Sequence, residues 1–350
     1  MNSLTKNLEG AIKRIILLQK EDGCIPWTED GVFDAWNHLE CVMALNTLGY
    51  SKEVDLGFSY LKKNQLNDGS WLGELGSTLD IDEKKGTFIN RDIESKVFFR
   101  DTNFAAYIAT ACWHDFLINN SVDNLTNNWG MIEKAINFVI ENQMKDGSIR
   151  WAAKSLEAPK DDSLLTGCCS IYKSLICAIN CASQLNKERP NWTQSLEKLE
   201  NAIKNKPESF DKTWESKKRF SMDWYYPVLC GAIAGKKAEE RINSQWNKYV
   251  LNEKGCLCVL DQPWVTIAET AELAIALIKI QKKDEAKELL SWINDYIDSD
   301  GAYWMGRQVT EKVFWPMEKP GWTSAAVILA YDALHNFSKG SSIFLDDNLI

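Results

Sequence analysis

Four aspartates stand at the beginning of apolar segments that are rich in small residues: Asp34, Asp101, Asp162 and Asp223. A single aspartate in such a position is explained by helix capping, because its carboxylate accepts hydrogen bonds from the first backbone N–H groups of a helix. Four carboxylates around one opening would also repel one another, and that repulsion raises the pKa of at least one carboxyl group. A carboxyl group that keeps its proton can act as a general acid.

We therefore expect Asp34, Asp101 and Asp223 to be catalytic, together with His38. His38 follows Asp34 at helical spacing, so both side chains lie on one face of a helix. An imidazole titrates near neutral pH, which suits acid–base catalysis. A buried, hydrogen-bonded core histidine explains His38 equally well, and capping alone remains the alternative explanation for each aspartate.

Aromatic and polar side chains gather near the same segment starts, and 15 tryptophans are many for a chain of 350 residues. Aromatic faces stabilise a carbocation or stack on a sugar ring, although core packing accounts equally well for about half of these rings. We predict a substrate-binding role for these residues: Trp36, Asn37, Arg100, Asn103, Asp162, Trp224, Tyr225, Trp264, Glu269, Trp315 and Trp322.

A second group of tryptophans follows a recurring turn. An Asp-Gly or Lys-Gly pair occurs at 22–23, 68–69, 146–147, 254–255 and 300–301, and an amphipathic helical stretch precedes each pair. A glycine there suits the left-handed residue that ends a helix, and a following tryptophan can cover the helix end. We therefore assign four tryptophans to the turns and leave them out of the site: Trp27, Trp71, Trp151 and Trp304.

The turns divide the chain into repeats. The long interval between Gly147 and Gly255 spans about two periods, which implies a sixth, degraded copy. Each copy holds an amphipathic outer helix and a more apolar inner helix, and strand signals are almost absent. The pattern predicts an all-α (α/α)6 toroid, in which six helical-hairpin repeats close into a double ring over residues 1–340, with a C-terminal tail at 341–350. All inner helices would then start at one face, where their first turns converge on a funnel.

The second copy is the most complete: Tyr60-Leu61 is followed at fixed spacing by Gln65, Gly69 and Trp71. This pattern resembles the QW motif of the squalene cyclase and prenyltransferase superfamily, whose members fold as α/α toroids. The resemblance implies a prenyltransferase-like or terpene cyclase-like enzyme that binds an isoprenoid or a similar hydrophobic substrate in the Asp-lined, aromatic funnel. It is more specific for the fold than for the reaction, since one fold hosts many functions.

Two other function classes remain open. The first is a carbohydrate-active α/α-barrel enzyme of the glycoside hydrolase, lyase or epimerase type, in which two carboxylates such as Asp34 and Asp101 act on a sugar. Four polar residues favour it, because a hydrocarbon needs fewer polar partners: Asn37, Asn103, Thr266 and Glu269. The second is a non-catalytic toroid that binds a ligand.

Charge and composition bound the partners. The net charge of −9 argues against nucleic-acid binding, so we expect a small-molecule substrate. Ten cysteines without a CxxC pair, in a chain without a signal-peptide pattern, predict reduced thiols and a cytoplasmic location. We expect no transmembrane segment, while peripheral membrane contact stays open. No cofactor and no protein-bound metal are predicted, and magnesium is expected only if the substrate is a diphosphate.

Overall fold

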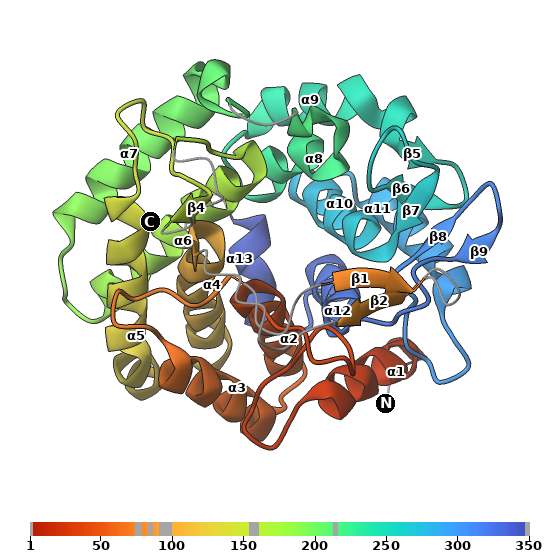
Figure 1. Ribbon diagram of the computed structural model, residues 1–350, viewed down its shortest axis with the longest axis horizontal. Helices are drawn as coiled ribbons and strands as arrows, with labels where there is room; N and C mark the ends of the chain where they lie inside the picture. The colour runs from red at the N-terminus through yellow and green to blue at the C-terminus, as the bar shows by residue number, and fades with distance from the viewer. Residues whose placement is uncertain are drawn as a thin grey trace.

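The computed structural model describes residues 3–73, 79–82, 87–90, 100–153, 161–212 and 216–346. Its inner helices form a closed ring, because each contacts the next along the chain and the last contacts the first (Figure 1). Within the described residues these helices are α2 (Ala35–Thr47), α4 (Thr102–Asn119), α6 (Leu165–Gln184), α8 (Ser221–Leu229), α10 (Ile267–Lys279) and α12 (Gly321–His335).

Outside the inner ring lies a second layer of helices: α1 (Ser3–Leu18), α3 (Ser51–Asn64), α5 (Val122–Glu141), α7 (Pro190–Asn205), α9 (Gly235–Tyr249) and α11 (Lys283–Trp292). Each outer helix packs on an inner neighbour, α1 on α12 and α3 on α2 for example. The outer helices bury one apolar stripe, whereas α4 and α12 are apolar on nearly every side. The chain is therefore a mostly helical α/α toroid.

The connections differ in length between the two ends of the helices. Short links such as 48–50 and 120–121 follow the inner helices, whereas long segments such as 19–34, 206–220 and 293–320 lead into them. The long connections therefore collect at the face where the inner helices start. Short 3-10 helices lie in two of them: η1 (Pro207–Ser209) with η2 (Lys217–Arg219), and η3 (Ile293–Tyr296).

The same connections contain antiparallel strands, which the sequence did not predict. Two-stranded sheets are formed by β1 (Leu79–Asp82) with β2 (Thr87–Asn90), and by β3 (Arg100–Asp101) with β4 (Ala152–Ala153). A five-stranded sheet joins β5 (Val250–Leu251), β6 (Gly255–Leu257), β7 (Trp264–Thr266), β8 (Gly306–Gln308) and β9 (Val313–Phe314). Strands of two to four residues are too short to show the alternating pattern by which strands are recognised.

The recurring turns join neighbouring outer helices. Gln65 Nε2 donates hydrogen bonds to Gly69 O in its own turn and to Met131 O in α5, both at 2.9 Å. Gly69 has φ +92°, and a Cβ there would lie 2.2 Å from Lys134 O, so only glycine fits this close approach. Gln19 and Gln143 make the equivalent bonds to α3 and α7. The left-handed conformation predicted for the turn glycines is confirmed at all five positions.

The C-terminal residues close the far end of the barrel. The 3-10 helix η4 (Lys339–Ser341) and the short helix α13 (Ser342–Leu345) pack against α4 and α12, and α13 also contacts α10. Lys279 Nζ donates to Phe344 O at 3.0 Å, and the Phe344 side chain lines a cavity inside the ring. Residues 341–346 of the predicted tail therefore lie against the inner helices.

One helix of the described part of the chain, α6, is long and apolar enough by composition to cross a membrane. It belongs to the inner ring, where α4, α7 and α8 cover it, and most of its side chains are buried. Burial inside the toroid accounts for its apolar character.

Candidate active site

Asp34 and Asp101 are N-caps, as the sequence suggests. Asp34 Oδ1 accepts from Asn37 N at 2.9 Å and Asp101 Oδ1 accepts from Phe104 N at 3.0 Å. The second carboxylate oxygen of Asp34 also accepts from Trp27 Nε1 and from Asn37 Nδ2, each at 2.5 Å. A cap needs no such support. Asp34 is therefore held in one orientation by two further side chains, and Trp27, assigned above to a turn, is one of them.

His38 lies on the side of α2 that faces away from the funnel. Its Nδ1 accepts from Ile25 N, its Nε2–H donates to Gly57 O in α3, both at 3.1 Å, and the ring is completely buried. Burial lowers the pKa of His38 to about 4, against the opposing effect of these hydrogen bonds. The imidazole therefore joins α2 to α3 and does not meet the aspartates at the helix starts.

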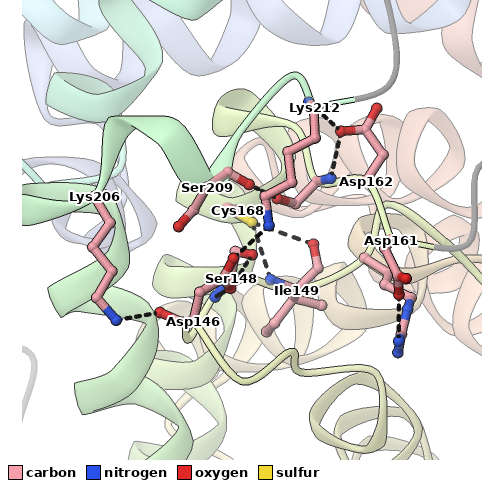
Figure 2. Close-up of polar contacts among 11 residues, drawn as sticks. Asp146, Ser148, Ile149, Asp161, Asp162, Cys168, Lys206, Ser209 and Lys212 are labelled. Atoms are coloured by element: carbon pink, nitrogen blue, oxygen red, sulfur yellow. Dashed lines mark hydrogen bonds and ion pairs between the residues drawn. The ribbon is translucent and has the colours of Figure 1, made fainter.

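Asp162 binds the connection between α7 and α8. Its Oδ1 accepts from Ser163 N at 3.0 Å and from Lys212 N at 2.9 Å, so it joins the start of the α6 segment to the chain after η1. Figure 2 shows that the Lys212 side chain turns to Asp146 in the turn after α5, where Nζ donates to Oδ2 at 2.5 Å. The other oxygen, Oδ2, is buried and has no hydrogen-bond partner in the protein, so the predicted role of Asp162 in substrate binding stays a prediction.

Asp223 and Trp224 lie on the outer side of α8. Trp224 stacks on Tyr249 of α9 at a centroid distance of 5.2 Å and donates to Arg241 O at 2.8 Å. Burial, followed by repulsion from Asp211, raises the pKa of Asp223 to about 6, while Arg241 opposes the rise. Both residues therefore stand toward α9 and away from Asp34 and Asp101.

Several predicted residues do meet at the starts of the inner helices. Trp36 and Asn37 begin α2, Asn103 begins α4, Glu269 begins α10 and Trp322 begins α12. Buried polar atoms without a hydrogen-bond partner in the protein occur there among the described residues: Trp36 Nε1, Asn103 Oδ1, Asp162 Oδ2, Asp223 Oδ1, Thr266 Oγ1, Glu269 Oε2, Trp322 Nε1, Thr323 Oγ1 and Ser324 Oγ. Buried polar groups are normally paired, so this cluster fits a polar ligand.

Other predicted residues lie in the connections that lead into the inner helices. Trp264 in β7 donates from Nε1 to Trp315 O at 2.6 Å, and the two rings meet edge to face with their centroids 5.3 Å apart. The pair joins the two connections that lead into α10 and α12. Arg100 lies in β3, where it pairs with Ala153 of β4 beside the cap Asp101.

Two glutamates, Glu40 of α2 and Glu272 of α10, lie one helical turn deeper, inside the ring. Both oxygens of Glu272 accept from tyrosine hydroxyls, Oε2 from Tyr225 and Oε1 from Tyr226, the latter at 3.3 Å. Burial raises the pKa of Glu272 to about 8, although the Tyr225 hydrogen bond opposes the rise, and the charge of Glu269 adds to it. Burial and the charge of Glu272 raise the pKa of Glu40 as well.

The two glutamates, with Tyr107 and Lys173, line a cavity of about 30 Å³, room for about two water molecules. Trp36 stands above it, with ring centroids 5.9 Å from Tyr107 and 6.2 Å from Tyr226. Among the described residues, no three His, Cys, Asp or Glu side chains are grouped as metal ligands would be.

The sequence is similar to that of a known enzyme over most of its length. It is 39% identical over 326 residues to the MMP endo-(1,4)-3-O-methyl-alpha-D-mannosidase of Mycolicibacterium hassiacum, and the match covers 93% of this chain and 85% of the relative. This chain belongs to the family of that mannosidase. No protein-family model matches the sequence.

Solved structures share the fold of this chain. A glycosidase variant in complex with glucose superposes with a TM-score of 0.73 at 12% identity, covering 95% of this chain and 99% of that one. A D-mannose isomerase superposes with a TM-score of 0.64 at 13% identity, covering 93% and 96%. At such identities the likeness concerns the α/α-barrel architecture alone.

Membership in the mannosidase family corrects the resemblance to the squalene cyclase and prenyltransferase superfamily. The isoprenoid substrate and the transferase or cyclase activity that it implied are wrong, and the carbohydrate-active alternative is the one supported. The physical reason lies in the motif itself. Gln65 and Gly69 join outer helices to one another, so the repeat reports how a toroid is held together and carries no information about the reaction.

Three residues near the site of this mannosidase-family chain were not predicted from the sequence as site residues. Glu40 and Glu272 stand one turn inside the apolar inner helices, and Trp151, assigned to a turn, lines a pocket beside Trp36. A charged residue within an otherwise apolar helical segment was a usable signal for both glutamates, because burying an ionisable group is costly.

Proposed function

We propose that this chain is a glycosidase that hydrolyses α-mannosidic bonds inside an oligosaccharide of mannose, with O-methylated mannose among its units. The activity that the relative's name states, that of an endo-acting 3-O-methyl-mannosidase, supports the substrate class. The polar and aromatic groups at the helix starts support a sugar, since a sugar offers hydroxyls to unpaired atoms and a flat face to rings. Hydrolysis by two carboxyl groups needs no cofactor.

Asp34 and Glu269 are the carboxyl groups that we propose for the reaction. They begin α2 and α10, which flank α12, so the start of α12 with Trp322 and Thr323 lies between them. The observation that carries the proposal is that the two carboxyl groups differ in their hydrogen-bond partners. Donors hold both oxygens of Asp34, whereas Glu269 presents a buried oxygen without a protein partner. A fixed carboxylate suits a base or nucleophile, and an unpaired carboxyl oxygen suits the acid that protonates the leaving sugar.

The test is hydrolysis of defined oligomannosides by Asp34→Asn and Glu269→Gln. Both changes keep the side-chain size, and asparagine still caps a helix, so the fold should survive. We expect kcat to fall by about 10²–10⁴-fold in each variant, the usual contribution of a general acid or base. Glu269→Gln should recover activity on aryl oligomannosides, whose leaving group needs no proton, whereas Asp34→Asn should not.

Asp162→Asn is the comparison variant, because Asp162 also begins an inner-helix segment and has a buried oxygen without a protein partner, Oδ2, but its Oδ1 binds the neighbouring connection. It should hydrolyse oligomannosides at close to the wild-type rate. Full activity of Asp34→Asn or Glu269→Gln on unactivated oligomannosides would exclude the pair as assigned.

We also propose that the six hairpins are copies of one unit, that residues 1–340 form a single domain, and that the protein acts in the cytoplasm. The equivalent bonds of Gln19, Gln65 and Gln143 support the repeats. The ten cysteines are free and nine are buried, which fits a reducing compartment. Mass spectrometry of the protein purified under thiol-blocking conditions should find all ten unpaired.

A further inference from the structure

A second pocket opens beside Trp36, between the starts of α4, α6 and α8, with a volume of about 280 Å³. Its walls are mainly apolar, and Trp36 forms the boundary with the funnel. We call it the side pocket. Six of the residues that line it are Trp36, Asn103, Phe104, Trp151, Phe220 and Met222.

The polar residues that line the side pocket are Asp101, Thr102, Asn103, Thr166 and Lys217, and among them the Thr102 hydroxyl donates to Arg150 O while the Lys217 ammonium lies over the Phe220 ring. Asn103 is 4% exposed, and its Oδ1 has no hydrogen-bond partner in the protein. Asp101 also lines the pocket, but its Oδ1 is engaged in capping α4. An unpaired buried acceptor is costly, so Asn103 fits a ligand that donates a single hydroxyl there.

The chemistry of these walls discriminates between sugars. A mannose unit presents several hydroxyls, and each hydroxyl buried against an aromatic or methionine side chain without a partner costs free energy. A methyl ether removes the donor and adds apolar surface, so it gains from the same walls. The pocket therefore matches a sugar that keeps one free hydroxyl toward Asn103 and carries a methyl group on its other edge.

We propose that the side pocket is a subsite for an O-methylated mannose unit, with the methyl ether against Phe104, Phe220 and Met222 and a hydroxyl donated to Asn103. This inference rests on the proposed glycosidase function. It adds that the preference for methylated chains is set at the starts of α4, α6 and α8, next to Trp36 at the start of α2.

Gly167 offers a way to fill the side pocket. It lies in α6 and lines the pocket, and a Cβ there would have Asn103 Cβ as its nearest contact at 3.9 Å, an ordinary packing distance. An added Cβ therefore meets no backbone atom, and we choose Gly167→Leu to fill the pocket from this position. Gly130→Leu is the matched control, because Gly130 is an exposed helical glycine of α5 with nothing within 4 Å of an added Cβ.

The experiment compares kcat/KM for a matched pair of oligomannosides, one unmethylated and one 3-O-methylated. We expect the wild type and Gly130→Leu to prefer the methylated substrate by about 10-fold or more, the usual effect of one methyl group in an apolar pocket. Gly167→Leu should bring that ratio close to one, because its side chain takes the space of the methyl group and lowers kcat/KM mainly for the methylated substrate. Met222→Gln, which keeps the volume and adds polarity, should also lower the ratio.

Three outcomes would overturn the subsite, and they differ in what they say of the glycosidase. If the wild type hydrolyses both substrates equally, or Gly167→Leu lowers both rates by the same factor, the pocket does not recognise the methyl group and the glycosidase proposal stands. If the wild type hydrolyses neither substrate, both proposals fail together.

Discussion

Glu272 makes the stability of this protein depend on pH. Its pKa of about 8 lies above the ordinary 4.5 because the carboxyl group is buried. Between these values the folded state holds a proton that the unfolded chain has released, so the free energy of unfolding should fall as the pH rises from about 5 to about 8. Glu272→Gln cannot titrate and should make that fall shallower, which urea unfolding at several pH values would measure. An equally steep fall in the variant would contradict the assignment.

His38 should prove structural rather than catalytic. His38→Leu removes the acceptor for Ile25 N and the donor to Gly57 O, and an unsatisfied buried group costs about 1–3 kcal/mol. We expect a lower unfolding temperature at pH 7 and an unchanged pH profile of kcat, because its pKa of about 4 leaves the ring neutral in the working range. If His38→Leu lost one arm of the pH profile of kcat while its unfolding temperature stayed unchanged, His38 would be catalytic.

At the scale of the elements, the turn glutamines should stabilise the outer layer. Gln143 Nε2 donates to Gly147 O in its own turn and to Ser195 O in α7, both at 2.9 Å. Gln143→Ala leaves both carbonyls without this donor, so we expect about 1–3 kcal/mol of destabilisation in urea unfolding. Gln194→Ala, at an exposed position of α7, should change stability by less than about 0.5 kcal/mol. Equal effects would show that the bridging bonds contribute nothing.

The elements also show how far sequence patterns reach. The outer helices have a single apolar stripe, so their buried faces were predictable from helical periodicity. The inner helices α4 and α12 are apolar all round, and periodicity could not say which side chains face the axis. Trp224 was predicted in the funnel because it stands near the start of an inner helix, and the structure places it against Tyr249 on the outer side of α8.

For the whole molecule, closure of the ring depends on contact between its two ends. Gly10 of α1 meets the turn after α11, where a Cβ on Gly10 would lie 2.2 Å from the Gly301 carbonyl carbon. Gly10→Ala should therefore force these ends apart and cost about 1–3 kcal/mol, with faster hydrogen exchange in α1 than in α5. Gly130→Ala, an exposed change in α5, should be neutral or slightly stabilising. If hydrogen exchange in α1 were unchanged, the contact between α1 and the turn after α11 would not depend on Gly10.

By itself, the sequence determined the repeated turns, the alternation of outer and inner helices and the face at which the aspartates begin helices, because these follow from local spacing and backbone conformation. Only the tertiary structure decided that Asp34 is supported by Trp27, that Asp162 binds a neighbouring connection and that Glu40 and Glu272 share the interior. Those contacts join residues far apart in the chain, and a side chain's chemistry depends on the partners that folding brings to it.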